Sequence, residues 1–551
     1  MKKKNKFFSV AMGSLLLLSA GVGCSVSEEN VTPTIPGADT VLQICVAAKG
    51  YGTDFAYNLA DAYNKLGTGV EARVVKTSIN GTIQDNQLML GPDRCKIDLF
   101  FTLLNSVFSQ QVKANSYHWA DLSSVYDSPA VGYTEADGTV TLEQLLDPIY
   151  VKNFTYTDGK QYALPYTSGV VGLLYNKSKW DSTNANLESA GKQTLELPKT
   201  TDEMFTLFNR MKTQEVKDAS EGAYAFSYSG QNSYLHFMFN ALWPQYMGAT
   251  AAENFYEGKD ENGVYTADIF KSDARKYAYE VIRKMVMKTN GYVSKEDSQK
   301  VYSQEQEAFI GGSAFFSING DWMERETSKN LKPGAVEIEM IRTPVMSEIV
   351  ENPKISADFT GTEAEKDAKL SSIIDFIDEN YIDKNGSANA TDAASLGVSL
   401  NTLEYIVHAR LVRHNLVDFV ACVPEYSEEL DAAKDFLKFV YSKEGQEIML
   451  SSTYGSAAPM TIDYSQMEYY NTATPYCKSR LKITEKSIPY GNANNYPMQY
   501  LGGLDVYSEG NMAAGFGGKK VATAKEVMME EYNNYSLIWN SMMGTAGVSN
   551  Q

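Results

Sequence analysis

Residues 41–52 read VLQICVAAKGYG, and this stretch decides the fold of the chain. Its first eight residues are almost all apolar, which is typical of a parallel strand covered on both faces. The KGYG turn leads into a helical pattern over residues 54–66, which Gly67 ends. Residues 70–75 and 97–101 are predicted as the next two strands. This order predicts an open, mostly parallel α/β sheet.

The carboxyl ends of these strands are where a ligand site is expected. In open α/β sheets, small molecules bind in the crevice beyond the carboxyl ends of the strands. The loops at residues 49–52 and 102–105 follow the first and third predicted strands. They are therefore the first candidates for ligand contact.

Composition and charge exclude several classes of function. The chain has 551 residues, of which 43% are apolar and 21% charged, so it can bury a core and form more than one domain. The formal charge is −19 with no basic stripe, which disfavours nucleic acid and anionic membrane surfaces as partners. The 36 tyrosines point weakly towards sugar faces, since half-buried surface tyrosines are equally common.

The N-terminal residues have the pattern of an export signal. Four lysines lie within residues 1–6, and an apolar run over residues 7–23 ends in AGVGC at Cys24. The small residues before this cysteine resemble the lipobox of bacterial lipoproteins, although Gly21 replaces the usual larger aliphatic residue. We expect residues 1–23 to be a signal peptide and Cys24 to be lipidated, with residues 24–40 as a tether. An uncleaved membrane anchor is the alternative.

The remainder of the chain alternates between helical and polar segments. Residues 199–316 are predicted to be mainly helical, and residues 314–318 form a short strand. Residues 347–415 are read as an insertion with a helical patch at 370–381. Residues 432–450 are predicted to form one amphipathic helix. After the leader, no segment approaches a transmembrane length, so the chain is not expected to be a transport pore.

Signatures of catalysis and of metal binding are lacking in the sequence. Its four histidines form no HExxH motif, and there is no GxSxG or phosphate-binding glycine loop. We therefore expect no enzyme activity, no cofactor and no metal, although a carboxylate pair among 68 acidic residues stays possible. No disulfide is predicted, and Cys45 lies in a buried strand where a small apolar side chain fits. The other three cysteines after the leader are Cys95, Cys422 and Cys477.

Four segments, in this order, resemble the family 1 extracellular solute-binding proteins of ABC importers, the group that includes maltose-binding proteins. They are KGY at 49–51; DGKQYALPY at 158–166 with GLLYNK at 172–177 and LPKTTDE at 197–203; EAFIGG at 307–312 with SINGDW at 317–322; and AAKDFLKFV at 432–440 with SKEGQ at 442–446. Each is short, but together they span residues 40 to 460. Residues 347–415 and the tail after residue 463 have no clear counterpart in the maltose binder.

The resemblance implies a two-lobed, type II periplasmic-binding-protein-like α/β fold with the ligand in the interlobe cleft. The chain would cross between the lobes near residues 170–174, 337–344 and 454–458. The expected division is 41–170 plus 337–455 for lobe 1, including the insertion, and 171–336 plus 456–551 for lobe 2.

The same resemblance implies a function outside the cell. The chain would capture a sugar or oligosaccharide by hinge closure and deliver it to the transmembrane subunits of an ABC permease. It would act as a monomer, anchored through Cys24 at the extracellular face of the cell membrane. Three alternatives stay open: a glycan-binding or sensory module without transport, a membrane-anchored glycan-degrading enzyme, and a ligand such as a polyamine or metal complex. The sugar, its linkage and its chain length are not predicted.

Candidate ligand-binding residues combine aromatic rings with hydrogen-bonding groups, as a neutral sugar requires. Trp322 and Asp321 end the third resembling segment, and Lys49 and Tyr51 follow the first strand. Each has a plainer alternative, such as a core tryptophan, a turn-capping aspartate or a solvated lysine. The remaining candidates are Trp243, Tyr166, Gln231 and Tyr234.

Overall fold

A computed structural model of the protein describes residues 32–78, 94–103, 119–135, 138–156, 158–232, 234–328, 332, 334–416, 419–491, 512, 515–517 and 521–546. The signal segment, Cys24 and most of the tether lie outside these residues. So do residues 79–93, between the second and third predicted strands, and residues 104–105 of the predicted ligand loop. None of the helices within the described ranges combines the length and apolar character needed to cross a bilayer.

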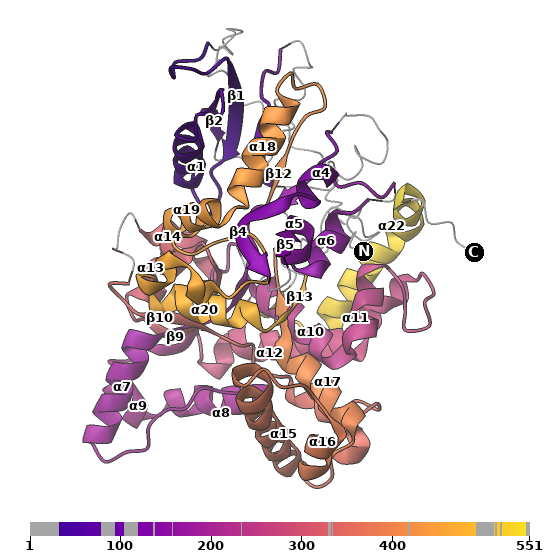
Figure 1. Ribbon diagram of the computed structural model, residues 1–551. Helices are drawn as coiled ribbons and strands as arrows, with labels where there is room; N and C mark the ends of the chain where they lie inside the picture. Colours follow the sequence, from indigo (N-terminus) through magenta and orange to yellow (C-terminus); the bar gives the residue numbers. More distant parts are fainter. Residues whose placement is uncertain are drawn as a thin grey trace, which may run out of the picture.

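The first lobe is built on a five-stranded sheet at the top of Figure 1. Its order is β2 (Val70–Ser78), β1 (Thr40–Ala47), β3 (Leu99–Leu103), β12 (Phe419–Cys422) and β6 (Leu164–Pro165). β1 lies parallel to both β2 and β3, whereas β12 is antiparallel to β3 and β6. The predicted strands and the α/β fold class are therefore confirmed, but the sheet is not mostly parallel, because β12 enters it antiparallel to both of its neighbours.

Short helices and a hairpin complete the first lobe. α1 (Asp54–Asn64) buries Phe55, Leu59 and Tyr63 against the sheet, while Leu66 lies beyond its end and is exposed. The remaining elements are α4 (Ser123–Tyr126), β4 (Pro129–Glu135), β5 (Gly138–Thr141), α5 (Leu142–Leu145) and α6 (Pro148–Phe154). Cys45 is fully buried in β1, as predicted, and the four described cysteines are free thiols.

The second lobe contains a four-stranded sheet whose two inner strands are buried along their whole length. The order is β10 (Ile338–Ile341), β7 (Val171–Asn176), β9 (Ala314–Gly320) and β8 (Tyr224–Ser227). Its main helices are α7 (Lys177–Ser189), α8 (Thr201–Met211), α9 (Gln214–Ala219), α10 (Leu235–Met247), α11 (Ala249–Tyr256), α12 (Asp273–Val286), α13 (Tyr302–Ile310) and α14 (Met323–Thr327). β9 also buries two polar residues, and the Ser317 hydroxyl in its middle donates a hydrogen bond to the Glu305 carboxylate over 2.7 Å.

One predicted crossing between the lobes lies elsewhere in the structure. We expected the chain to cross near residues 337–344 and to continue in lobe 1. Instead, β10 pairs antiparallel with β7, so this segment belongs to the second sheet. The crossing occurs after the insertion, where Asn415 bridges Val170 and the Leu416 amide bonds to Gly169. The 347–415 insertion lies between these two points, which is why the boundary moves along the chain.

Of the other two connections, one follows β6 and the other lies beyond residue 460. Residues 166–170 lead from β6 in the first sheet to β7 in the second. The third connection leaves α19 (Lys443–Thr453), which packs on α1, and reaches α20 (Pro475–Glu485), which packs on β10. Met460 still bridges Leu146 of the first lobe, so lobe 2 resumes later than residue 456.

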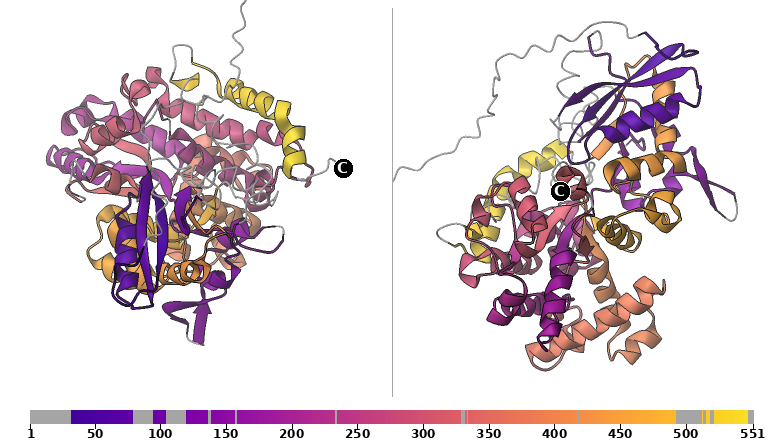
Figure 2. Two further views of the ribbon diagram at one scale, coloured as in Figure 1. Left: turned by 90° about the horizontal axis from the view of Figure 1, so that it is seen from above. Right: turned by 90° about the vertical axis from the view of Figure 1, so that its left-hand side faces the viewer.

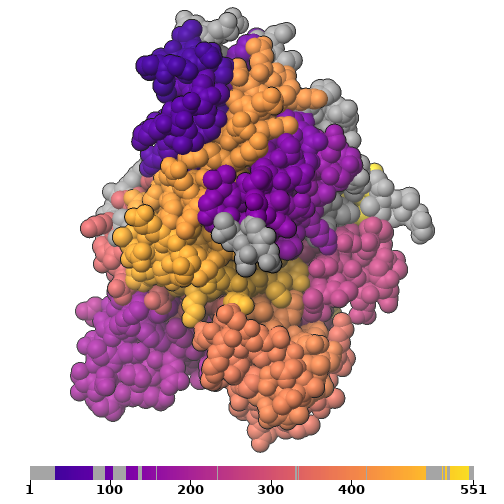
Figure 3. Space-filling view, viewed as in Figure 1, coloured from indigo at the N-terminus to yellow at the C-terminus, as the bar shows by residue number. Residues whose placement is uncertain are grey.

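The insertion folds around its own apolar core and projects from the second lobe. α15 (Glu363–Ile377), α16 (Ala390–Ser395) and α17 (Leu400–Leu411) pack together, and β11 (Val412–His414) returns the chain to the connection. It is attached to α10 through the Asn352 side-chain amide, which donates to the Tyr246 carbonyl over 2.7 Å. Figures 2 and 3 show this part of the chain at the end of the molecule opposite the first sheet.

The helix predicted over residues 432–450 is two helices. α18 (Leu430–Val440) ends before Ser442, whose hydroxyl accepts a hydrogen bond from the Gly445 amide and caps α19. A side chain at Gly445 would lie 2.2 Å from the Phe439 carbonyl oxygen, so glycine is required at this tight break. The apolar spacing continues across the break, which is why periodicity alone joined the two helices.

The C-terminal helix α22 (Ala524–Ala546) is held against the second lobe by a buried ion pair (Figure 2). The Arg275 guanidinium from α12 bonds to the Glu531 carboxylate, and both side chains are almost fully buried. Tyr279 donates a further hydrogen bond to Glu531 over 2.8 Å. Aromatic rings, including those of Phe239 and Phe255, surround the guanidinium, so its charge depends on Glu531 for compensation.

We expect Glu531→Gln to destabilise the protein strongly, because it leaves the buried charge of Arg275 without a counter-ion. The cost should be about 3–5 kcal/mol in urea unfolding followed by circular dichroism. Asp268→Asn is the control, since Asp268 pairs with Lys271 on the surface of the same lobe, where an ion pair contributes less than about 1 kcal/mol. Equal losses in the two variants would contradict the compensation argument.

Candidate functional site

The two lobes meet where the turn after β1 contacts the residues that follow β9. Gly50 in this turn has a φ of +41°, and a side chain there would lie 2.9 Å from the Cβ of Trp322. A larger residue would therefore push the lobes apart. The KGYG turn and the NGDW segment are the first and third motifs singled out from the sequence, and the structure brings them into contact.

Trp322 lies at the centre of an aromatic cluster contributed by both lobes. Its ring centroid is 6.3 Å from that of Tyr51 in the first lobe, and it lies 6.4 Å from Tyr234 and 5.9 Å from Phe237 in the second. All three contacts are edge-to-face, the arrangement that aromatic quadrupoles prefer. Only 5% of Trp322 is exposed, so this arrangement of the lobes encloses the indole.

Asp321 is buried beside this cluster and links the lobes by a hydrogen bond. Its carboxylate accepts from the Tyr51 hydroxyl over 2.7 Å, and its backbone amide donates to the Val170 carbonyl over 2.9 Å. Burial raises the pKa of this carboxyl, while the positive charge of Arg480, 3.8 Å away, opposes the shift. Asp321 therefore serves the junction itself in this arrangement of the lobes.

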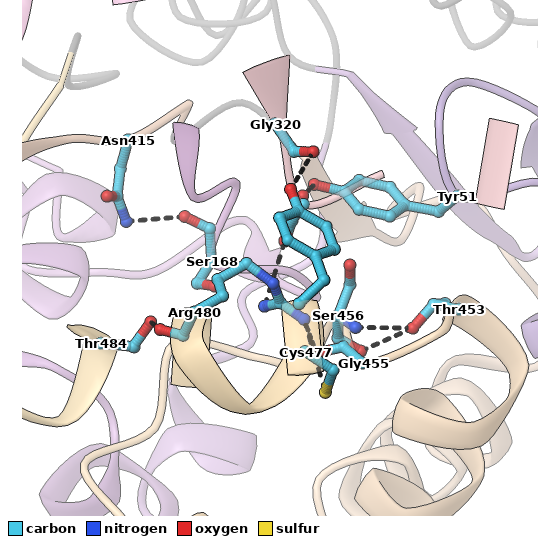
Figure 4. A network of polar contacts seen from close by, with 12 residues as sticks. Tyr51, Ser168, Gly320, Asn415, Thr453, Gly455, Ser456, Cys477, Arg480 and Thr484 are labelled. Carbon is cyan, nitrogen blue, oxygen red and sulfur yellow. Dashed lines mark hydrogen bonds and ion pairs between the residues drawn. The ribbon is translucent and has the colours of Figure 1, made fainter. Parts of the chain in front are cut away.

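Arg480 reaches the junction from α20, a part of the chain that the motifs did not indicate. Its guanidinium donates to the Gly455 carbonyl at the third connection. Tyr476, one turn earlier on α20, donates to the Gly320 carbonyl over 2.7 Å, just before Asp321. Figure 4 shows Arg480 near Gly455, with Gly320 and Tyr51 beside each other above it. The Thr474-Pro475 pair indicates from the sequence where α20 begins. It does not indicate that α20 lies at the junction, because the position of the helix depends on tertiary packing.

A charged pair lies at the edge of the junction. Lys49 is exposed in the first-lobe turn, and its positive charge favours the ionised form of Glu326 in the second lobe. The Glu326 carboxylate accepts a hydrogen bond from the Gln306 side-chain amide over 2.7 Å. Burial nevertheless raises the pKa of Glu326 to about 7.

Three predicted site residues lie outside this cluster. Tyr166 has no ring contact with Trp322 itself: its ring lies edge-to-face against Tyr51 at 6.4 Å and stacks on Phe55 in the first-lobe core at 5.4 Å. Trp243 is buried in the second-lobe core, with its ring 4.5 Å from that of Phe255. Gln231 lies in an exposed loop and donates to the Ser298 carbonyl. No local sequence pattern separates core positions from junction positions, because Tyr, Trp and Gln occur in either environment.

No metal site is found among the residues that the structure describes. These residues include no group of three or more His, Cys, Asp or Glu side chains arranged to hold a metal ion. The junction offers aromatic faces, a tyrosine hydroxyl and ionised groups, which suit a polar organic ligand better than a cofactor.

Comparison with known protein families identifies one match. Residues 58–368, more than half of the chain, match the family described as bacterial extracellular solute-binding protein. A comparison with curated protein sequences finds no match.

Solved structures share the fold at low sequence identity. Maltose-bound MalE3 of T. maritima superposes with a TM-score of 0.54 at 14% identity, over 91% of this chain and 100% of that one. The GacH receptor of Streptomyces glaucescens gives 0.55 at 14%, over 91% and 98%. A family 1 extracellular solute-binding protein from Bifidobacterium longum subsp. infantis gives 0.50 at 15%, over 91% and 100%. These likenesses confirm the predicted two-lobed fold.

We expect Glu326 to make stability fall as pH rises. Its pKa is about 7 in the folded protein against an ordinary value of 4.5, so the folded state holds the proton more tightly. The favourable contribution is complete below pH 4.5 and is lost as pH rises through 7. Glu326→Gln should remove up to about 3 kcal/mol of this decline in urea unfolding. The exposed Glu296→Gln variant should follow the wild-type curve, and identical curves for all three proteins would contradict the assignment.

Proposed function

Because the chain belongs to the bacterial extracellular solute-binding proteins, we propose that it captures a sugar or oligosaccharide between its lobes and delivers it to an ABC importer. The aromatic cluster of Trp322, Tyr51, Tyr234 and Phe237 is the observation that carries the proposal. Sugars present apolar C–H faces edged by hydroxyls, and aromatic rings with neighbouring polar groups match both features. Similar solved structures include complexes with maltose, acarbose and raffinose.

The proposed mechanism is closure about the three connections between the lobes. A ligand that contacts both lobes binds the closed arrangement better than the open one and shifts the population towards it. Tyr51 and Lys49 would act from the first lobe, and Trp322, Asp321 and Tyr234 from the second. Since Trp322 is enclosed in the present arrangement, the ligand would reach the indole when the lobes separate and would replace some of its protein contacts.

The lobe boundaries that we propose follow the sheets. The first lobe takes residues 40–168 and 419–461, and the second takes residues 170–344 with α20 and α22. The insertion at 345–411 is an appendage of the second lobe. With these boundaries the insertion lies outside the proposed binding site, which is the junction between the two lobes. The protein would bind the ligand there without reacting with it.

We further propose that the protein acts as a lipid-anchored monomer on the outer face of the cell membrane. The family is extracellular, and the AGVGC sequence ending at Cys24 is the feature that favours a lipid anchor. The tether that follows is rich in Ser, Pro, Thr and Gly, which suits a flexible spacer between membrane and lobes. The permease subunits would meet the closed lobes, and nucleic acid is not a partner.

Trp322→Ala should weaken sugar binding about tenfold or more, because a stacked aromatic contributes about 1–3 kcal/mol by analogy with base stacking. A thermal-shift screen of mono- and oligosaccharides, with polyamines and metal salts as controls, first finds the ligand, and calorimetry then compares the variants. Trp243→Phe is the control and should bind normally, because Trp243 lies in the second-lobe core.

Each outcome of this screen decides one point. Unchanged affinity in Trp322→Ala would remove Trp322 from the site. A shift with a polyamine or metal alone would keep the family and overturn the sugar class. Cleavage of the bound sugar, seen by mass spectrometry, would overturn the binding-protein proposal in favour of an enzyme.

Cys24→Ser should abolish lipid attachment when the full chain is expressed in a bacterial host fed an alkyne-tagged fatty acid. The wild type should carry the tag in the membrane fraction, because only a cysteine at the cleavage site accepts the lipid. Ser27→Ala, in the tether, should be tagged like the wild type. A tagged Cys24→Ser protein would contradict the anchor.

A further inference from the structure

α14 makes a second contact with the first lobe, separate from the aromatic cluster. The Arg325 guanidinium donates to the Asp54 carboxylate over 2.6 Å. Asp54 is the first residue of α1, and Arg325 lies 271 positions later in the second lobe. The pair therefore adds a contact between the two lobes to the Tyr51–Asp321 hydrogen bond and the Tyr51–Trp322 ring contact. Any rotation that separates α1 from α14 lengthens it.

The backbone of the first-lobe turn is shaped to receive Arg325. Gly52 has a φ of +70°, and a side chain there would lie 2.6 Å from the Nη2 atom and 3.0 Å from the Cζ atom of Arg325. The guanidinium thus lies directly against the Gly52 backbone, as Trp322 lies against Gly50. Both glycines of the KGYG turn make room for residues of one short segment, 322–325.

Charged residues of opposite sign follow each other along the chain on each side of this contact. The first-lobe turn presents the positive Lys49 and then the negative Asp54, while the second lobe presents the positive Arg325 and then the negative Glu326. Arg325 contacts Asp54 directly, whereas Lys49 acts on Glu326 through its charge alone. Such complementarity fixes the register in which two surfaces meet. A slip of the lobes would bring like charges together.

We propose that Asp54 and Arg325 form an ion-pair latch that positions the first lobe on the second when they close. The latch rests on the proposed function, since closure around a ligand gives it a role. It extends that function, because the contact between the lobes would favour the closed arrangement before any ligand binds. Apparent affinity scales with the fraction of protein in the binding-competent arrangement. The two residues then act as positioning residues and need not touch the ligand.

The test measures the distance between the lobes without ligand in the full chain, in which Cys24 is replaced by Ser so that it takes no label. Spin labels on cysteines introduced at Leu66 and Tyr224, which are exposed on different lobes, report the distribution by double electron–electron resonance. The four described native cysteines are buried. Asp54→Asn and Arg325→Gln should each lower the closed-to-open ratio about two- to fivefold, the size expected for a partly exposed ion pair.

The double variant separates a latch from independent effects. If the residues act on each other, Asp54→Asn with Arg325→Gln should fall no further than either single variant. Asp435→Asn is the matched control, since its carboxylate is as exposed as that of Asp54, at 62%, and pairs within α18. Raising the salt from about 0.05 M to 1 M should lower the wild-type ratio to that of the variants, because salt screens exposed pairs.

An unchanged distribution in both single variants would overturn the latch, and so would additive effects in the double variant. An equal fall in the closed-to-open ratio in Asp435→Asn would show that the ratio responds to net charge, and would also overturn the latch. The measurement uses no sugar, so a failed ligand screen leaves its result intact. A confirmed ligand with no distance change would retain the proposed function and remove the latch.

Discussion

The burial of the Asp321 carboxylate is the constraint on which the junction depends. A carboxylate in a dry interior is costly unless charged and hydrogen-bonding partners compensate it. Here two distant parts of the chain compensate the carboxylate, Tyr51 after the first strand and Arg480 on α20, while the Asp321 backbone amide donates to the Val170 carbonyl at the first connection. The strand β9, the turn after β1 and the helix α20 must therefore converge for Asp321 to be satisfied. This convergence places the aromatic cluster between the lobes.

Backbone shape at the first turn matters as much as side-chain chemistry. A turn with side chains at positions 50 and 52 would hold α14 away, because Trp322 and Arg325 occupy the space that those side chains would need. Glycine at both positions lets one short segment supply an indole and a guanidinium to the same surface. The close approach in turn excludes water around Tyr51 and Asp321, which strengthens their hydrogen bond.

The added segments of the chain relate to the site in different ways. The 345–411 insertion packs on its own core and touches α10 from the side remote from the first sheet, so it adds mass without forming the junction. α22 stiffens the second lobe through Arg275 and Glu531. α20 differs from both, since its Arg480 and Tyr476 are part of the junction. The tail thus completes a site whose other residues precede it by more than a hundred positions.

The sequence by itself determined the βαβ order, the glycine turn and the NGDW segment, because strands, turns and caps are set by neighbours within a few residues. It also placed Cys45 in a buried strand correctly. Only the tertiary structure decided that Trp322 lies between the lobes while Trp243 lies in a core, that β10 joins the second sheet, and that Arg480 compensates Asp321. Burial and charge compensation arise from segments hundreds of residues apart. A local sequence pattern does not indicate which distant segment will pack against it.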